Sequence, residues 1–150
     1  MGDFRFHHLE RLRVDQALPR LLERAYEEGC QVVVRASSDE AVAALNDRLW
    51  TYEDASFLPH GALGDGDQAS QPIFLTARVE NPNAATTLVL LSGAPTSESD
   101  AAFNEVLRVF DGRDGEAVEE ARREWKRLKD AGFALSYWRE GEDGGWARQR

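Results

Sequence analysis

Residues 31–36 (QVVVRA) contain three consecutive valines, and this run limits the possible folds more than any other segment. A strand with one solvated face alternates apolar and polar residues, whereas an unbroken apolar run is typical of a strand buried on both faces. Such strands occur mainly in parallel sheets that are covered by helices. Residues 72–76 (PIFLT) and 86–91 (TTLVLL) are two more runs of this kind. The sequence therefore predicts a mostly parallel sheet.

A first helix is expected after a short strand at residues 3–7. Asp15 is its expected N-cap, Pro19 is expected near its first turn, where a missing N–H matters least, and Gly29 is expected to end it. Its buried stripe consists of residues that recur at helical spacing: Val14, Ala17, Leu18, Leu21, Leu22, Ala25 and Tyr26.

A second helix is expected to be capped by Ser37 or Ser38 and to end near Trp50. The apolar face of this helix is formed by Ala41, Val42, Leu45 and Leu49. A surface loop with short extended stretches is expected at residues 51–71, because glycines and polar residues are frequent there.

The sequence of the C-terminal half predicts two helices and a strand. Residues 101–110 are expected to form a short helix, with Ala102, Phe103, Val106 and Leu107 on one side. A longer helix is expected at residues 116–131, ended by Gly132, and the last strand at residues 133–138. Strands that alternate with helices predict a three-layer α/β fold.

Length, charge and cysteine content narrow the class of protein. The 150 residues suit one domain, expected at residues 1–140, and residues 141–150 are expected to form a frayed polar tail. A net charge of −9 opposes nonspecific coating of duplex DNA, so any basic site must be local. Cys30 is the single cysteine, so an intrachain disulfide is impossible and a reducing, cytoplasmic setting fits best. Neither a signal peptide nor a membrane span is predicted.

Sequence signals of catalysis are weak. The segment after the first strand contains no glycine, and the glycine-rich residues 61–67 lack the Lys-Ser/Thr pair of a P-loop. His7 and His8 are adjacent on a strand, so their side chains point to opposite faces and form no metal site together. Cys30 is expected to be an inert, largely buried thiol. The sequence predicts no catalytic residue, no cofactor and no metal.

Aromatic residues are concentrated in LWTYEDASFLPHG, at residues 49–61. Trp50, Phe57 and Pro59 fall around the end of the second helix and the following loop. Large apolar residues on a loop either fold back onto the core or contact a partner, and aromatic residues are enriched at protein interfaces. Both interpretations stay open on the residues alone.

Basic residues are concentrated in ARREWKRLK, at residues 121–129, which carries five cations and one acid. Arg122, Lys126 and Lys129 lie at helical spacings i, i+4 and i+7 and form one basic ridge, which Trp125 borders. Cations also favour a helix C-terminus and offset the acids just upstream, which explains two or three of them. This explanation does not cover a tryptophan among five cations. That combination indicates a site for an anionic, partly apolar ligand such as an acidic peptide.

Three segments resemble the chi subunit of bacterial DNA polymerase III: FHHLERL at residues 6–12, LWTYEDASFLPHG, and ARREWKRLKDAG at residues 121–132. LW followed by SFLPH and then QPI is the most specific part of the resemblance, which spans nearly the whole chain in order. Residues 61–70 and 92–100 match no pattern of the family. The resemblance implies a Rossmann-like α/β domain without catalytic activity.

The resemblance also implies two partners. Chi subunits link the clamp loader to the single-stranded-DNA-binding protein by gripping its acidic C-terminal tail, which ends in a phenylalanine carboxylate. The tail site falls on Arg122, Trp125 and Lys126, with Lys129 expected to attract the tail's acids at longer range. The psi subunit of the clamp loader is the other implied partner, at Trp50, Phe57 and Pro59. DNA would be contacted only indirectly, and no membrane is involved.

Two other functions remain as alternatives. A small α/β enzyme could use His60 and carboxylates around the loop at residues 57–66. Direct binding of single-stranded DNA could use the basic helix, with bases stacked on Trp125. The charge of −9 argues against the second alternative.

Overall fold

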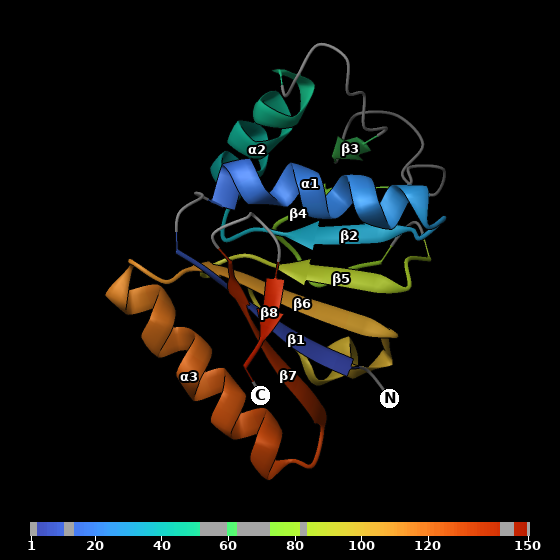
Figure 1. Ribbon diagram of the computed structural model, residues 1–150. Helices are drawn as coiled ribbons and strands as arrows, with labels where there is room; N and C mark the ends of the chain where they lie inside the picture. Colours follow the sequence, from blue (N-terminus) through green and yellow to red (C-terminus); the bar gives the residue numbers. More distant parts are fainter. Residues whose placement is uncertain are drawn as a thin grey trace.

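The computed structural model describes residues 3–10, 14–51, 60–62, 73–81, 84–141 and 146–149. In this part of the chain the strands are β1 (Asp3–Leu9), β2 (Val32–Arg35), β3 (His60–Ala62), β4 (Ile73–Thr76), β5 (Thr87–Leu90), β6 (Glu105–Asp111), β7 (Ala134–Glu140) and β8 (Trp146–Arg148). The helices are α1 (Val14–Glu27), α2 (Asp39–Thr51), α3 (Gly115–Asp130) and the short 3-10 helix η2 (Glu98–Ala102). These strands form one sheet in the order β3-β4-β2-β5-β6-β1-β7-β8 (Figure 1).

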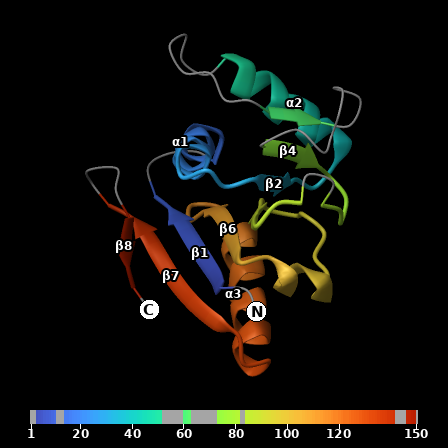
Figure 2. The same ribbon diagram turned by 90° about the vertical axis from the view of Figure 1, so that its right-hand side faces the viewer.

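The predicted three-layer α/β fold is confirmed. Neighbouring strands are parallel except at β8, which runs antiparallel to β7. One hydrophobic core joins α1 and α2 to one face of the sheet, and a second core joins α3 to the other face (Figure 2). In the described part of the chain, no helix combines the length and apolar character needed to cross a membrane.

The valine run forms a strand buried on both faces of a parallel sheet, as predicted. β2 lies between β4 and β5 and pairs in parallel with both. Val32 and Val34 enter the core beneath α1 and α2, whereas Val33 enters the core beneath α3. All three are fully buried, so β-branched side chains fill both faces of the strand.

Several predicted ends of the helices are confirmed. Ser38 caps α2, because its hydroxyl accepts a hydrogen bond from the N–H of Ala41 at 3.1 Å. Gly29 has a φ of 79° and is the second residue after α1, and Gly132 has a φ of 87° and is the second residue after α3. Both glycines adopt the left-handed conformation that ends a helix.

The start and the stripe of α1 differ from the prediction. The helix begins at Val14, so Asp15 is its second residue rather than its N-cap, and Pro19 lies inside the helix beyond the first turn. Tyr26 was predicted to be buried, yet 42% of it is exposed. Tyr26 lies in the last turn of α1, where the helix runs out past the core.

The prediction of a helix at residues 101–110 is wrong. Residues up to Ala102 belong to η2, and β6 follows, paired in parallel with β5 and β1. Val106 and Phe110 enter the core beneath α3, while Leu107 and Val109 enter the opposite core. This alternation has the period of a strand. The sequence did not reveal the strand, because a short apolar run buried on both faces is equally compatible with a buried helix.

The segment predicted to be a frayed tail contains β8. Trp146 packs against the core beneath α1 and meets the ring of His7 edge-on, with 4.7 Å between the ring centroids. The backbone N–H of Gln149 donates to the carbonyl of Tyr137 at 2.7 Å. An aromatic side chain and ladder hydrogen bonds therefore hold residues 146–149 against β7.

Candidate functional site

Helix α3 carries the predicted basic ridge. The helix starts at Asp114, whose carboxylate accepts a hydrogen bond from the N–H of Glu116 at 3.1 Å. It ends where the N–H of Phe133 donates to the carbonyl of Leu128 at 3.1 Å. These caps fix the helix along β6 and β7, with which it makes its main contacts.

The apolar stripe of α3 faces the sheet. Ala117, Ala121 and Leu128 are buried, and Val118 and Trp125 are partly buried against the same core. The indole of Trp125 meets the ring of Phe6 edge-on at 5.3 Å and the ring of Tyr137 at 5.9 Å, measured between centroids. Trp125 thus stands at the boundary between the core and the surface of the helix.

The opposite face of α3 is exposed and basic. It carries Arg122, Arg123, Lys126, Arg127 and Lys129. Within the described residues, none of these five side chains forms an ion pair or a hydrogen bond. Their charge is therefore available to a ligand. We call this surface the basic face of α3.

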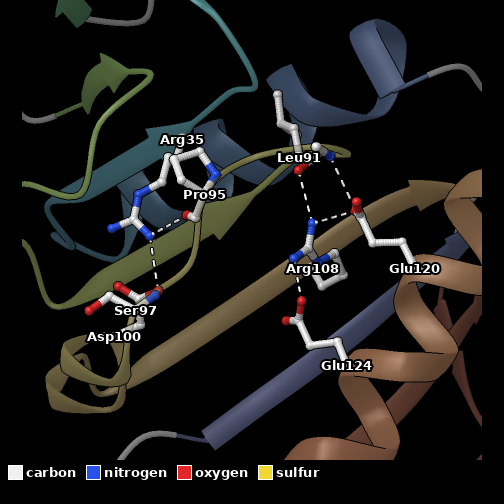
Figure 3. A network of polar contacts seen from close by, with 9 residues as sticks. Arg35, Leu91, Pro95, Ser97, Asp100, Arg108, Glu120 and Glu124 are labelled. Carbon is white, nitrogen blue, oxygen red and sulfur yellow. Dashed lines mark hydrogen bonds and ion pairs between the residues drawn. The ribbon is translucent and has the colours of Figure 1, made fainter.

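Two acids of the same helix turn inward instead of neutralising the basic face. Glu124 is buried and forms an ion pair with Arg108, and Glu120 accepts from Arg108 at 3.1 Å (Figure 3). Glu120 also accepts from the backbone N–H of Gly93 at 3.2 Å. Sequence reasoning missed this arrangement, because Arg108 lies on β6, where a helix was predicted.

A second buried pair fixes the loop that follows β5. Arg35 donates to Asp100 and to the carbonyl of Pro95, each at 2.9 Å (Figure 3). Asp100 also accepts from the backbone N–H of Ser97 at 2.9 Å. The loop that meets Glu120 through Gly93 is therefore anchored at both ends.

His8 lies on β1, on the face of the sheet that α3 covers. Its Nδ1 shares a hydrogen bond with the hydroxyl of Tyr137, and its ring packs against Phe110 at 5.2 Å between centroids. Burial lowers the pKa of His8 below its usual 6.5, the charge of Arg139 lowers it further, and Arg122 acts in the same direction. His8 is thus uncharged at neutral pH and leaves the cationic character of the site to α3.

His7 and His8 point to opposite faces of the sheet, as predicted. His7 contacts Trp138 and Trp146, whereas His8 contacts residues beneath α3. Among the described residues, no group of three or more His, Cys, Asp or Glu side chains is placed to hold a metal ion. The thiol of Cys30, predicted to be largely buried, is partly exposed, because it follows the Gly29 turn at the end of α1.

Of the predicted aromatic surface, the structure describes only the position of Trp50 along the chain. Trp50 falls in the last turn of α2, and Phe57 and Pro59 lie outside the described residues. α2 contacts β3 and β4, whereas α3 contacts β6 and β7 on the other face. The structure thus separates α2 from Arg122, Trp125, Lys126 and Lys129, which it brings together on one helix.

Comparison with known proteins identifies the family. The family model described as "DNA polymerase III chi subunit, HolC" matches residues 1–136. The chain is 35% identical over 110 residues to the "Probable DNA polymerase III subunit chi" of Rickettsia prowazekii (strain Madrid E), a match that covers 73% of this chain and 66% of that protein. It is 21% identical over 123 residues to the "DNA polymerase III subunit chi" of Escherichia coli (strain K12), covering 82% of this chain and 83% of that protein. The chain therefore belongs to the DNA polymerase III chi subunit family.

Proposed function

We propose that this protein is a non-catalytic adaptor of the replication machinery, which links the clamp loader to single-stranded-DNA-binding protein. The basic face of α3 would grip the acidic C-terminal tail of that protein. The observation that carries this proposal is the set of five exposed cations beside Trp125, unpaired within the described residues, in a chain of net charge −9. Glu120 and Glu124 are engaged by Arg108, so these two acids of the helix do not pair with its cations.

The chemistry of the tail matches this surface. Arg122 and Lys126 lie one helical turn apart, so both can reach one terminal carboxylate, and each charge-assisted hydrogen bond is worth about 1.5–3 kcal/mol. The partly buried indole of Trp125 forms a wall for the terminal phenyl ring, whose burial adds roughly 1.5–3 kcal/mol. Ordering the tail offsets much of this energy, so we expect a Kd on the order of micromolar.

Single substitutions on α3 test the site. Arg122→Ala or Lys126→Ala is expected to raise the Kd for a tail peptide about tenfold or more, because each removes one contact with the carboxylate. Arg123→Ala is the matched control: it removes one exposed cation from the same helix but lies off the ridge. Fluorescence anisotropy of a labelled peptide measures the Kd, and an amidated peptide should bind as weakly to the parent protein as the free-acid peptide binds to the variants.

The same titrations address direct DNA binding. If Arg122→Ala and Lys126→Ala bind the peptide as tightly as the parent protein, the tail site is not on α3. If the parent protein binds a bare single-stranded oligonucleotide more tightly than it binds the peptide, and Arg122→Ala or Lys126→Ala weakens that binding, the helix is a nucleic-acid site instead. The net charge of −9 favours the peptide.

We propose psi, or another component on the clamp-loader side, as the partner of Trp50, Phe57 and Pro59. The support is the resemblance of residues 49–61 to the chi family and the position of Trp50 at the end of α2. Trp50→Glu is expected to abolish co-purification of this partner while the far-ultraviolet circular dichroism stays that of the parent protein. A Trp50→Glu protein that fails to fold would instead place Trp50 in the core.

A further inference from the structure

A cavity of about 730 Å³ lies on the face of the sheet opposite α3. It opens between α1 and the strands β1 and β7, with β8 at its rim. Figure 2 shows α3 on one side of β1 and β7, while α1 does not extend over β7 and β8. The basic face of α3 therefore does not contribute to this cavity, which is lined among others by Arg5, His7, Arg20, Arg24, Trp138 and Trp146.

His7 is the buried polar group of this cavity. Only 6% of the residue is exposed, and neither of its ring nitrogens has a hydrogen-bond partner among the described residues. Burial lowers the pKa of His7 to about 4, with further lowering by Arg5 and Arg24, so the ring is uncharged at neutral pH. A neutral imidazole offers one N–H donor and one acceptor, and leaving both unsatisfied is costly.

Two indoles stand next to this imidazole. The ring of Trp138 is nearly parallel to that of His7, with an angle of 12° and 6.5 Å between centroids. Trp146 meets His7 edge-on at 87°. Both tryptophans lie beyond residue 136, where the family model's match ends. The cavity thus combines flat apolar walls with a buried donor and acceptor, which suits a flat heteroaromatic ring that carries both kinds of group on its edge.

The arginines that line the cavity differ in whether they form ion pairs. Arg5 forms ion pairs with Asp3 and Glu105, and Arg24 forms one with Glu28. Arg20 is exposed and has no ion pair or hydrogen bond with another described residue. One guanidinium without an ion pair can bind a single phosphate group. The carboxylates nearby would repel the additional negative charge of a triphosphate.

We propose that this cavity binds one nucleotide unit, with the base against Trp138 and Trp146, the edge of the base on His7, and one phosphate on Arg20. The volume lies within the range of roughly 300–1,000 Å³ that is usual for small-molecule sites. The unit is either a free mononucleotide or the terminal nucleotide of a single strand, since both carry the same chemistry. This function goes beyond tail binding and uses none of the residues of α3.

Cys30 provides the readout, because it is the single cysteine of the chain, is partly exposed and lines the cavity. The full chain is treated with a thiol reagent that reports its own reaction by absorbance, and AMP is titrated up to millimolar concentration. AMP is expected to slow the reaction of Cys30 saturably and at least about fivefold, because it fills the cavity. ATP is expected to bind no tighter than AMP, and ribose 5-phosphate, which lacks the base, is expected to give no protection.

Three variants locate the site. Arg20→Ala is expected to raise the apparent Kd for AMP at least about fivefold, the effect of losing one charged contact. His7→Phe keeps an aromatic ring but removes both nitrogens, and is expected to weaken AMP binding to a similar extent. Lys126→Ala removes one cation from α3 and is expected to leave AMP binding unchanged, so tail binding and nucleotide binding fail independently. Thermal unfolding of each variant, with and without AMP, confirms that the protein compared is folded.

Oligonucleotides distinguish the two sources of the nucleotide unit. A short single strand with a 5′-phosphate that protects Cys30 better than both AMP and the same strand without the phosphate assigns a strand end to the cavity. Equal or better protection by AMP assigns a free mononucleotide. Absence of protection by AMP and by both oligonucleotides overturns the proposal, and so does protection by AMP that is equal in the parent protein, Arg20→Ala and His7→Phe.

Discussion

At the residue scale, Arg108 determines which side chains of α3 face the solvent. Its guanidinium holds Glu124 and Glu120 and donates to the carbonyl of Leu91 at 2.9 Å. Removing one partner of a buried ion pair costs about 3–5 kcal/mol, although the pair itself contributes far less net stability. The pair therefore opposes rotation of the helix about its axis, which keeps Arg122 and Lys126 outward.

Two glycines near α3 should respond oppositely to alanine. A Cβ on Gly112 would lie 1.9 Å from Nε2 of His8, whereas a Cβ on Gly115 would meet nothing within 4 Å. Gly112→Ala is expected to lower the free energy of unfolding by about 1–3 kcal/mol, through overpacking. Gly115→Ala is expected to raise it by about 0.4–1 kcal/mol, because the unfolded chain loses freedom.

Urea denaturation of the two variants measures both effects, and each serves as the control of the other. A Gly112→Ala protein as stable as the parent would show that His8 can leave its place beside Tyr137 at no cost. That result would contradict a fixed position of the His8 ring beside Tyr137.

At the scale of elements, β8 completes the sheet next to β7. Trp146→Ala is expected to lower the free energy of unfolding by about 2 kcal/mol, less than the 3–5 kcal/mol of a fully buried aromatic, because Trp146 is only partly buried. Gln149→Ala is the control, since this exposed side chain bonds only to its near neighbour Ala147 among described residues and should change stability by no more than about 0.5 kcal/mol. Equal stability of the two variants in thermal melts would show that residues 146–149 form a frayed tail, as the sequence predicts.

Local pattern was enough to predict most elements, and it failed where partners are distant. The valine run and the caps Ser38 and Gly132 depend on neighbours in sequence, so periodicity and capping rules found them. β6 was missed because only its pairing with β1 and β5 distinguishes it from a helix. β8 was missed because one tryptophan in a polar segment gives no period.

The candidate site divides in the same way. The ridge of Arg122, Lys126 and Lys129 follows from spacing within one helix. The inward turn of Glu124 depends on Arg108, sixteen positions away on another element, and the contact between His8 and Tyr137 joins residues 129 positions apart. Distant pairs of this kind leave no mark on local periodicity.

At the scale of the whole molecule, burial of uncharged histidine makes folding sensitive to pH. The pKa of His7 is about 4 in the folded protein, whereas the ordinary histidine pKa of 6.5 applies to the unfolded chain. Between these values the unfolded state binds more protons, so the stability is complete above pH 6.5 and is lost as the pH falls towards 4. The lowered pKa of His8 acts in the same direction.

We expect the free energy of unfolding to fall by about 2 kcal/mol between pH 7.5 and pH 5 because of His7. Urea denaturation at both pH values measures the change. In the His7→Phe protein the fall should be smaller by about this amount, and the slope that remains is due to His8 and the carboxylates. The same slope in the parent and in His7→Phe would show that His7 takes up a proton in the folded state.

The inward turn of Glu120 and Glu124 also has a consequence at long range. With these carboxylates held by Arg108, five exposed cations concentrate positive charge on α3 in a chain of net charge −9. In the field of a polyanion such a molecule experiences a torque that turns α3 forward, even though its net charge is repelled. The protein therefore approaches a negatively charged assembly already oriented, and salt that screens the field should slow the encounter more than it weakens the complex.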